Sequence, residues 1–154
     1  MKYVTIIVAF LMMLSSPVVG QNNSRMLNKG KGAWAAGNYA VAQEFFLPLA
    51  NAGNADAQIE LGWMHHAGQG VPQDKKEAHM WWSKAAKQGV AYAQALLGHT
   101  YEFGDGVLQD YVMAHMWDNI ASSNGDDEFG RRYRDRVAEK MTKEEISKAQ
   151  AMAR

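Results

Sequence analysis

Two sets of residues fall at helical spacing in the middle of the chain. One set falls at positions i, i+3, i+4 and i+7, which form one face of a helix with 3.6 residues per turn, and a second set follows after a loop. The first set is Gln58, Leu61, Gly62 and His65, and the second is Ala78, Trp81 and Ala85. The pattern predicts two short helices, with small residues where another helix packs against them.

The same pattern appears again 36 residues further on. Residues 54–89, aligned without a gap on residues 90–125, share 16 identities in 36 positions, whereas unrelated segments would share about two or three. The identities include the letters AHMW, which end at Trp81 in the first copy and at Trp117 in the second. A repeat of this length predicts a stacked array of helix pairs and an all-α fold.

The loop within each copy has residues that turn the chain and then begin the next helix. It reads GQGVPQD in the first copy and GDGVLQD in the second, with glycines that tolerate a positive φ angle. Asp74 and Asp110 stand where a side chain can cap the following helix. Gly89 and Gly125 stand where a glycine ends the second helix of each copy.

A family resemblance follows from these residues. Residues 55–89 read AxAQxxLGxMxxxGxGVPQDxxxAxxWxxKAAxQG and resemble the Sel-one-like repeat family, a branch of the tetratricopeptide-type α/α solenoids. The second copy departs from the pattern at several places, including Leu108 in place of Pro72 and His99 in place of Trp63. The resemblance implies a short right-handed α/α superhelical solenoid, and a binding architecture whose partners differ widely.

The first twenty residues have the pattern of a secretory signal peptide. Lys2 supplies a positive charge, residues 3–14 are almost entirely apolar, and small residues lead to Gly20. About 12 apolar residues are too few to cross a bilayer, which takes about 20. We therefore expect cleavage after Gly20 and an exported protein, periplasmic or secreted, with no stable membrane insertion after cleavage.

Segments on either side of the two copies complete the array. Residues 21–53 resemble a shortened tetratricopeptide-like first repeat with a tight turn at Gly37. Residues 126–154 are polar, and Thr142 with Glu145 has the spacing of a capping box before a last short helix. We expect residues 126–154 to form a pair of helices that caps the C-terminal end of the array.

Composition narrows the range of functions. Residues 21–154 carry 15 basic and 16 acidic side chains, a balance that does not suggest nucleic-acid binding. The chain has no cysteine, so neither a disulfide nor a thiolate site is available, and no cofactor is indicated. An array this short has a limited core, so we expect a monomer or a weak homodimer.

Comparing the two copies with each other predicts the binding surface. Opposite the packing stripe, the first helix of each copy carries a face on which none of six aligned positions is identical. Positions that build the stack should recur, whereas positions that bind a particular ligand are free to differ. Apolar and aromatic residues gathered on such a face are typical of interaction sites. The alternative is that several of these residues belong to the core between neighbouring first helices, or are scattered on a surface that binds nothing.

The resemblance implies that the first helix of each unit lines the concave surface. The predicted partner-binding groove therefore comprises Asp56, Ile59, Glu60, Trp63, His66, Tyr92, Leu96, His99, Glu102 and Phe103. A metal site is a weaker hypothesis, in which His65, His66 and His99 approach one another with Glu60 or Glu102 as a fourth ligand. No HExxH motif and no pair of histidines at i, i+4 supports it.

The sequence favours a non-catalytic module that binds a protein or peptide in its concave groove, as a periplasmic adaptor. An immunity protein that neutralises a secreted toxin is an alternative form of binding. A cell-wall or β-lactam hydrolase is the alternative outside binding, because Glu60 and Glu102 could supply two carboxylates. The serine-x-x-lysine, GxSxG and P-loop motifs are absent, and we expect no enzyme activity.

Overall fold

The computed structural model describes residues 17–125 and 129–154, which form helices and the turns between them. The helices are α2 (Pro17–Ala35), α3 (Tyr39–Asn51), α4 (Ala55–Ala67), α5 (Lys75–Ala86), α6 (Ala91–Phe103), α7 (Tyr111–Ser123), α8 (Phe129–Ala138) and α9 (Lys143–Met152). Most of the predicted signal peptide lies outside the described residues, and α2 runs through the predicted cleavage site at Gly20. None of the described helices combines the length and the apolar character that a membrane span requires.

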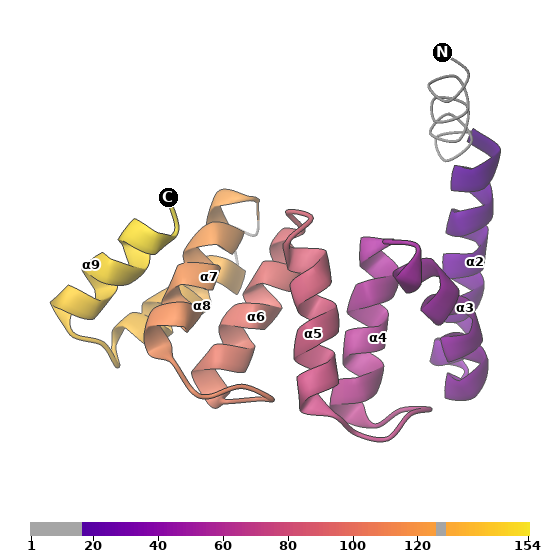
Figure 1. Cartoon of the computed structure of the whole chain (residues 1–154), viewed down its shortest axis with the longest axis horizontal. Helices are drawn as coiled ribbons and strands as arrows, with labels where there is room; N and C mark the ends of the chain where they lie inside the picture. The colour runs from indigo at the N-terminus through magenta and orange to yellow at the C-terminus, as the bar shows by residue number, and fades with distance from the viewer. Residues whose placement is uncertain (1–16, 126–128) are drawn as a thin grey trace, which may run out of the picture.

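Helices α2 to α7 stand side by side in chain order, and α9 lies at the end of the molecule opposite α2 (Figure 1). Helices α4 and α5 form the pair predicted within residues 54–89, and α6 and α7 form the pair within residues 90–125. Helix α8 packs on α7 and also contacts α6, and α9 packs on α7. This arrangement confirms the predicted all-α solenoid, and its last two helices cover the C-terminal end.

The predicted residues of the loop within each copy act as expected. Gly68 ends α4 with a φ angle of 68°, and Gly104 ends α6 with a φ angle of 71°, in the left-handed region that favours glycine. The carboxylate of Asp74 accepts hydrogen bonds from the first backbone amides of α5, and that of Asp110 accepts one at the start of α7. The local sequence therefore sets where each helix begins and ends.

A recurring glutamine joins each helix pair to the one before it. The side-chain amide of Gln58 donates to the backbone oxygen of Ala50 at 3.1 Å, and that of Gln94 donates to Ala86 at the same distance. The side-chain oxygen of Gln58 accepts from Gln88, as that of Gln94 accepts from Asn124. Both glutamines are buried, and satisfying a buried amide in this way avoids a cost of about 1–3 kcal/mol.

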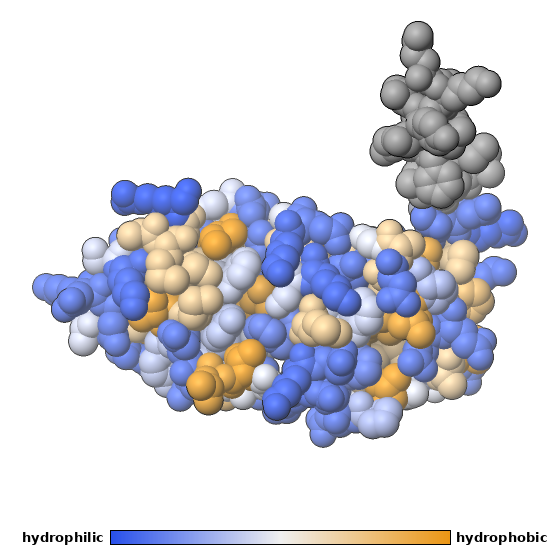
Figure 2. Space-filling view, in the orientation of Figure 1, coloured by the Kyte–Doolittle hydropathy of each residue, from blue (hydrophilic) through white to orange (hydrophobic). Residues whose placement is uncertain are grey.

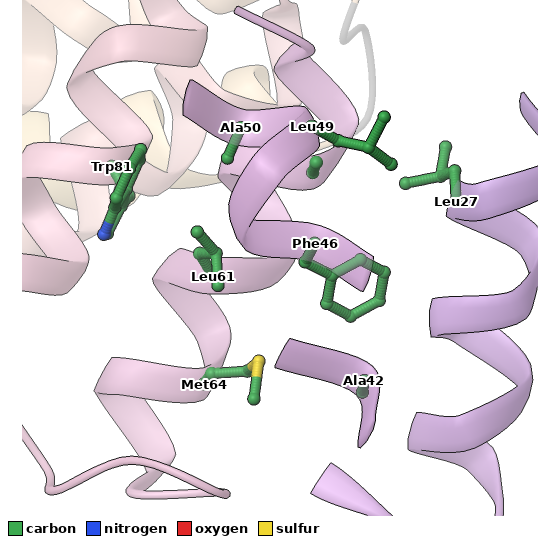
Figure 3. Packing of buried hydrophobic residues seen from close by; sticks show 9 residues of the cluster. Leu27, Ala42, Phe46, Leu49, Ala50, Leu61, Met64 and Trp81 are labelled. Atoms are coloured by element: carbon green, nitrogen blue, oxygen red, sulfur yellow. The ribbon is translucent and has the colours of Figure 1, made fainter. Parts of the chain in front are cut away.

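The core consists of two clusters along the array. In the first, Phe46 of α3 lies between Leu27 of α2 and the side chains of Leu61 and Met64 of α4 (Figure 3). The second cluster joins α4, α5 and α6, with Trp82 as its largest member. The face shown in Figure 2 is largely hydrophilic, with hydrophobic residues in small separate patches. Large exposed hydrophobic residues of the described part are Val41, Leu47, Met80, Tyr92, Phe103, Leu108 and Met152.

Candidate functional site

An aromatic cavity of about 270 Å³ lies between the first helices of the two repeats. Helices α4 and α6 form two of its sides, α5 contributes one indole ring, and α8 contributes one phenol ring. Its lining consists of Trp63, His66, Trp82, Tyr92, Ala95, Leu96, His99 and Tyr133. Largely apolar walls with a few polar groups are typical of a binding site.

Three rings pack against one another to form one wall of this cavity. The ring centroids of Trp63 and Trp82 are 5.1 Å apart with an interplanar angle of 68°, an edge-to-face arrangement. The His66 ring lies 5.6 Å from Trp63 and 5.5 Å from Trp82. The indole N–H of Trp82 donates to the backbone oxygen of Ile59 at 3.2 Å. This wall is therefore fixed by contacts within the protein before any ligand binds.

His66 is held by a carboxylate from the loop of the second repeat. Its Nε2 lies 3.3 Å from Oδ2 of Asp105, and the ammonium group of Lys75 donates to Oδ1 of Asp105 at 2.6 Å. Burial raises the pKa of Asp105, but the hydrogen bonds from Lys75 and His66 outweigh it and leave the pKa below its ordinary value. Asp105 is therefore ionised at neutral pH and links the end of α4, the start of α5 and the loop between α6 and α7.

His99 lines the cavity from α6 and is neutral at physiological pH. Burial lowers the pKa of His99, and this outweighs the opposite effect of the carboxylates of Asp105 and Glu102. Its ring lies 4.6 Å from the ring of Phe103. A neutral imidazole offers one donor and one acceptor to a ligand without adding a charge to the cavity.

The C-terminal helices complete the cavity through an ion-pair network. Glu102 of α6 is only 1% exposed, and its carboxylate accepts from Nε of Arg136 at 3.0 Å, from a second nitrogen of Arg136, and from Nζ of Lys140 at 3.0 Å. The guanidinium of Arg136 in turn lies 4.7 Å from the ring centroid of Tyr133. Glu102 therefore fixes α8 against α6 and places Tyr133 at the cavity.

A second, more polar cavity of about 170 Å³ adjoins the first. It is lined by Lys31 of α2, by Asp56, Ile59 and Glu60 of α4, and by Tyr92 of α6. The ammonium group of Lys31 lies 3.4 Å from the carboxylate of Glu60. Because Tyr92 lines both cavities, they are neighbours, and we call the two together the groove.

Eight of the ten residues predicted for the groove line these cavities. Asp56, Ile59 and Glu60 line the second cavity, Trp63, His66, Leu96 and His99 line the first, and Tyr92 lines both. Ile59 and Leu96 also belong to the buried cluster between the repeats. The alternative that some of these residues are core therefore holds for those two.

Glu102 and Phe103 line neither cavity. The prediction placed Glu102 in the groove because it aligns with His66, but its carboxylate is taken up by Arg136 and Lys140. Phe103 is 51% exposed and lies beside the same two cations, with the guanidinium of Arg136 5.5 Å from its ring. Both residues thus help to dock α8 and the turn that follows it on α6.

Two large side chains of the cavity were not predicted. Trp82 differs from its counterpart in the second copy, Asp118, so comparing the second helices of the two copies would have drawn attention to it. Tyr133 lies outside the repeats, in a polar segment with no aligned copy. The sequence carries no signal that brings Tyr133 to the groove.

The structure also bears on the alternative chemistries. Within residues 17–125 and 129–154, no group of three or more histidine, aspartate and glutamate side chains is arranged to hold a metal ion. Glu60 lines the second cavity, whereas Glu102 is buried in its ion-pair network. These two carboxylates therefore do not face a common cleft, as a hydrolase built on the pair would need.

Stacked helix pairs with a groove along their first helices define an α/α solenoid repeat protein. The Sel1 repeat model matches residues 55–90 and 91–126. A solved Sel1 repeat protein from Oxalobacter formigenes is 31% identical, with a TM-score of 0.66 over 81% of this chain and 97% of that one. The chain belongs to the Sel1 repeat family.

A second solved structure is a protective antigen present in uropathogenic Escherichia coli strains, which displays an SLR fold. It is 33% identical to this chain, with a TM-score of 0.81 over 85% of this chain. This chain spans only 29% of that protein. No curated protein sequence matches the chain significantly. Sel1 repeat proteins generally mediate protein–protein interactions, and the family is typically a non-catalytic scaffold.

Proposed function

We propose that this protein is an exported interaction module that holds an extended segment of a protein partner in the groove, and that it acts as an adaptor in the periplasm. The observation that carries the proposal is the aromatic cavity between α4 and α6. Its lining combines residues that differ between the two repeats, such as Trp63 and His99, with Tyr133 from outside them. Residues needed only for stacking would recur.

The size of the cavity suits one large apolar side chain. An apolar cavity of about 150 Å³ accommodates a benzene ring, so about 270 Å³ accommodates the side chain of a phenylalanine, tryptophan or leucine. Tyr92 is 44% exposed where the two cavities meet, so a partner can reach it without rearrangement. Exposed aromatic residues beside a pocket are typical of the residues that dominate binding energy.

An extended segment fits this geometry better than a flat protein surface. The two cavities are small, and Tyr92 lines both of them. A chain that crosses Tyr92 can place one side chain in each cavity, as extended peptides do in other recognition grooves. The imidazole of His99 is then available to its backbone.

Selection of displayed random peptides for binding to the full chain would test this proposal. Selection is expected to enrich sequences with one fixed large apolar residue. The Tyr92→Ala variant should bind the enriched peptides at least about ten-fold more weakly, because it removes the residue shared by both cavities. Leu108→Ala is the matched control, because Leu108 is 90% exposed and lines neither cavity. Equal binding by wild type and Tyr92→Ala, with both folded by circular dichroism, would refute the groove.

Export is tested separately from binding. N-terminal sequencing of protein recovered from the periplasm of a Gram-negative host is expected to begin at Gln21, because the signal pattern places cleavage after Gly20. A control with Lys2 retained and the apolar run of residues 3–14 interrupted by two aspartates should stay in the cytoplasm. Recovery of intact, uncleaved wild-type chain from the cytoplasm alone would contradict export.

A further inference from the structure

The two cavities of the groove differ in their electrostatic character. We infer that the bound segment carries a lysine or arginine two residues from its large apolar side chain, with the cation held by Asp56 and Glu60 in the second cavity. This inference rests on the proposed function and names the chemistry of the partner. The apolar side chain occupies the aromatic cavity, and the cation occupies the polar one.

The second cavity has an excess of negative charge. Its lining contains the carboxylates of Asp56 and Glu60 and the single cation of Lys31. Lys31 lies 3.4 Å from Glu60, whereas Asp56 forms no ion pair with any residue in the described ranges. Among the lining residues one negative charge therefore has no counterpart, and a cation from a partner would supply it.

The same cavity also suits the long stem of a basic side chain. Ile59 and Tyr92 line this cavity beside the carboxylates and give it an apolar surface. Lysine and arginine pack their methylene groups on apolar surfaces while the charged end stays in contact with polar groups or water. The ring of Tyr92 adds an aromatic surface of the kind that attracts cations.

The carboxylates near the aromatic cavity are already neutralised. Asp105 is paired with Lys75 and His66, and Glu102 is paired with Arg136 and Lys140. A second basic residue would gain little there, so the apolar side chain and the cation have distinct positions. The positions of the two cavities along the groove therefore determine where the apolar and the basic side chain of the bound segment lie.

The junction at Tyr92 sets the spacing between the two side chains. In an extended chain, residues i and i+2 point to the same side and are about 7 Å apart. The two cavities share Tyr92 in their linings, so the shortest chain that fills both has one intervening residue. Residue i+1 then points away from the groove and is free to vary.

Two pairs of synthetic peptides test the inference directly. Each pair has a tryptophan in a serine and glycine background, with lysine two residues after it in one pair and two residues before it in the other. The control peptide of each pair has glutamine in place of lysine. In one of the two pairs, the lysine peptide is expected to bind the full chain about five-fold more tightly than its control, because an exposed ion pair contributes up to about that much. The difference should shrink in 0.5 M salt.

Variants of the second cavity test whether its carboxylates cause the preference for lysine. The double variant Asp56→Asn, Glu60→Gln should abolish the preference for lysine over glutamine. Lys31→Gln should increase that preference by roughly two-fold, because it frees Glu60 from its partner. Glu44→Gln, at an exposed acidic residue of α3 that lines neither cavity, is the control and should leave the preference unchanged.

The possible failures are distinguishable. Peptides that bind in a Tyr92-dependent manner without any preference for lysine, or with a preference that survives the double variant, would refute the inference and leave the proposed function standing. Peptides of both pairs that show no Tyr92-dependent binding would refute the proposed function and, with it, the inference. Melting temperatures of the variants close to that of the wild type verify that each chain is folded.

Discussion

Gly62 of α4 lies against the indole ring of Trp82 of α5 so closely that a Cβ atom at position 62 would overlap the ring. The same relationship recurs in the second repeat, where Gly98 lies against the side chain of Asp118. The glycine is shared by the two copies, and the residue that covers it is not. Close approach of the two helices is therefore common to both repeats, whereas the larger side chain helps to make the cavity specific.

The first prediction concerns this contact. Gly62→Ala is expected to lower the free energy of unfolding by about 2 kcal/mol, because the added methyl group forces the Trp82 ring out of a packed position. Urea denaturation measures the change. Gly32→Ala is the control, since Gly32 lies in α2 with open space around it, and alanine there should raise the stability by up to about 1 kcal/mol. Equal stability of the Gly62 variant and the wild type would show that the helices can separate at little cost.

The second prediction concerns the recurring glutamine. Gln94→Leu is expected to cost about 2 kcal/mol, because the backbone oxygen of Ala86 and the amide of Asn124 each lose a partner. Thermal and urea denaturation measure the loss. Gln150→Leu, at an exposed position of α9, should stay within about 0.5 kcal/mol of the wild type. A similar result for both variants would mean that Gln94 does not hold the repeats together.

The third prediction concerns the docking of the C-terminal helices. Glu102→Gln is expected to cost about 1–3 kcal/mol, because it removes the buried negative charge and one of the two oxygens that accept from Arg136 and Lys140. Hydrogen exchange should show the loss of protection concentrated in α8, which carries Tyr133. Asp135→Asn removes an exposed ion pair with Arg134 and should change the stability by less than about 1 kcal/mol. Unchanged exchange in α8 would contradict the role given to Glu102.

The fourth prediction concerns pH. Burial lowers the pKa of His79, His99 and His115 below their ordinary value of 6.5. The unfolded chain then takes up protons at a higher pH than the folded chain, so the free energy of unfolding should decrease as the pH falls through 6.5 and towards the lowered folded values. Urea denaturation at pH 7.5, 6.5 and 5.5 measures this. His79→Gln should make the dependence shallower, and a stability that is constant over this range would contradict the assignment.

Local features of this protein could be read from its sequence. The helix bounds follow from glycines such as Gly68, which adopt positive φ angles, and from aspartates such as Asp74, which cap the next helix. The stacking follows from residues that recur, such as Gln58 and Gln94. Each of these signals acts within one helix pair or between neighbouring pairs, so the 36-residue period preserves it.

The composition of the groove was only partly determined in this way. Aligned positions of α4 and α6 that differ between the two copies pointed to Trp63, Tyr92 and His99, which do line the cavities. They also pointed to Glu102, which the structure pairs with Arg136 instead. A difference between aligned residues of the two copies marks a position that has a specific role. It does not distinguish contact with a ligand from contact with a helix outside the repeats.

Tertiary packing alone decided that distinction. Helix α8 has no counterpart in the repeats. Its position depends on how it packs against α7 and on the ion pairs that Arg136, within α8, and Lys140, just after it, form with the buried carboxylate of Glu102. These contacts join residues more than thirty positions apart. Because α8 lies outside the repeated units, no periodic pattern includes it, and the side chain of Tyr133 enters the groove only because the folded helices bring it there.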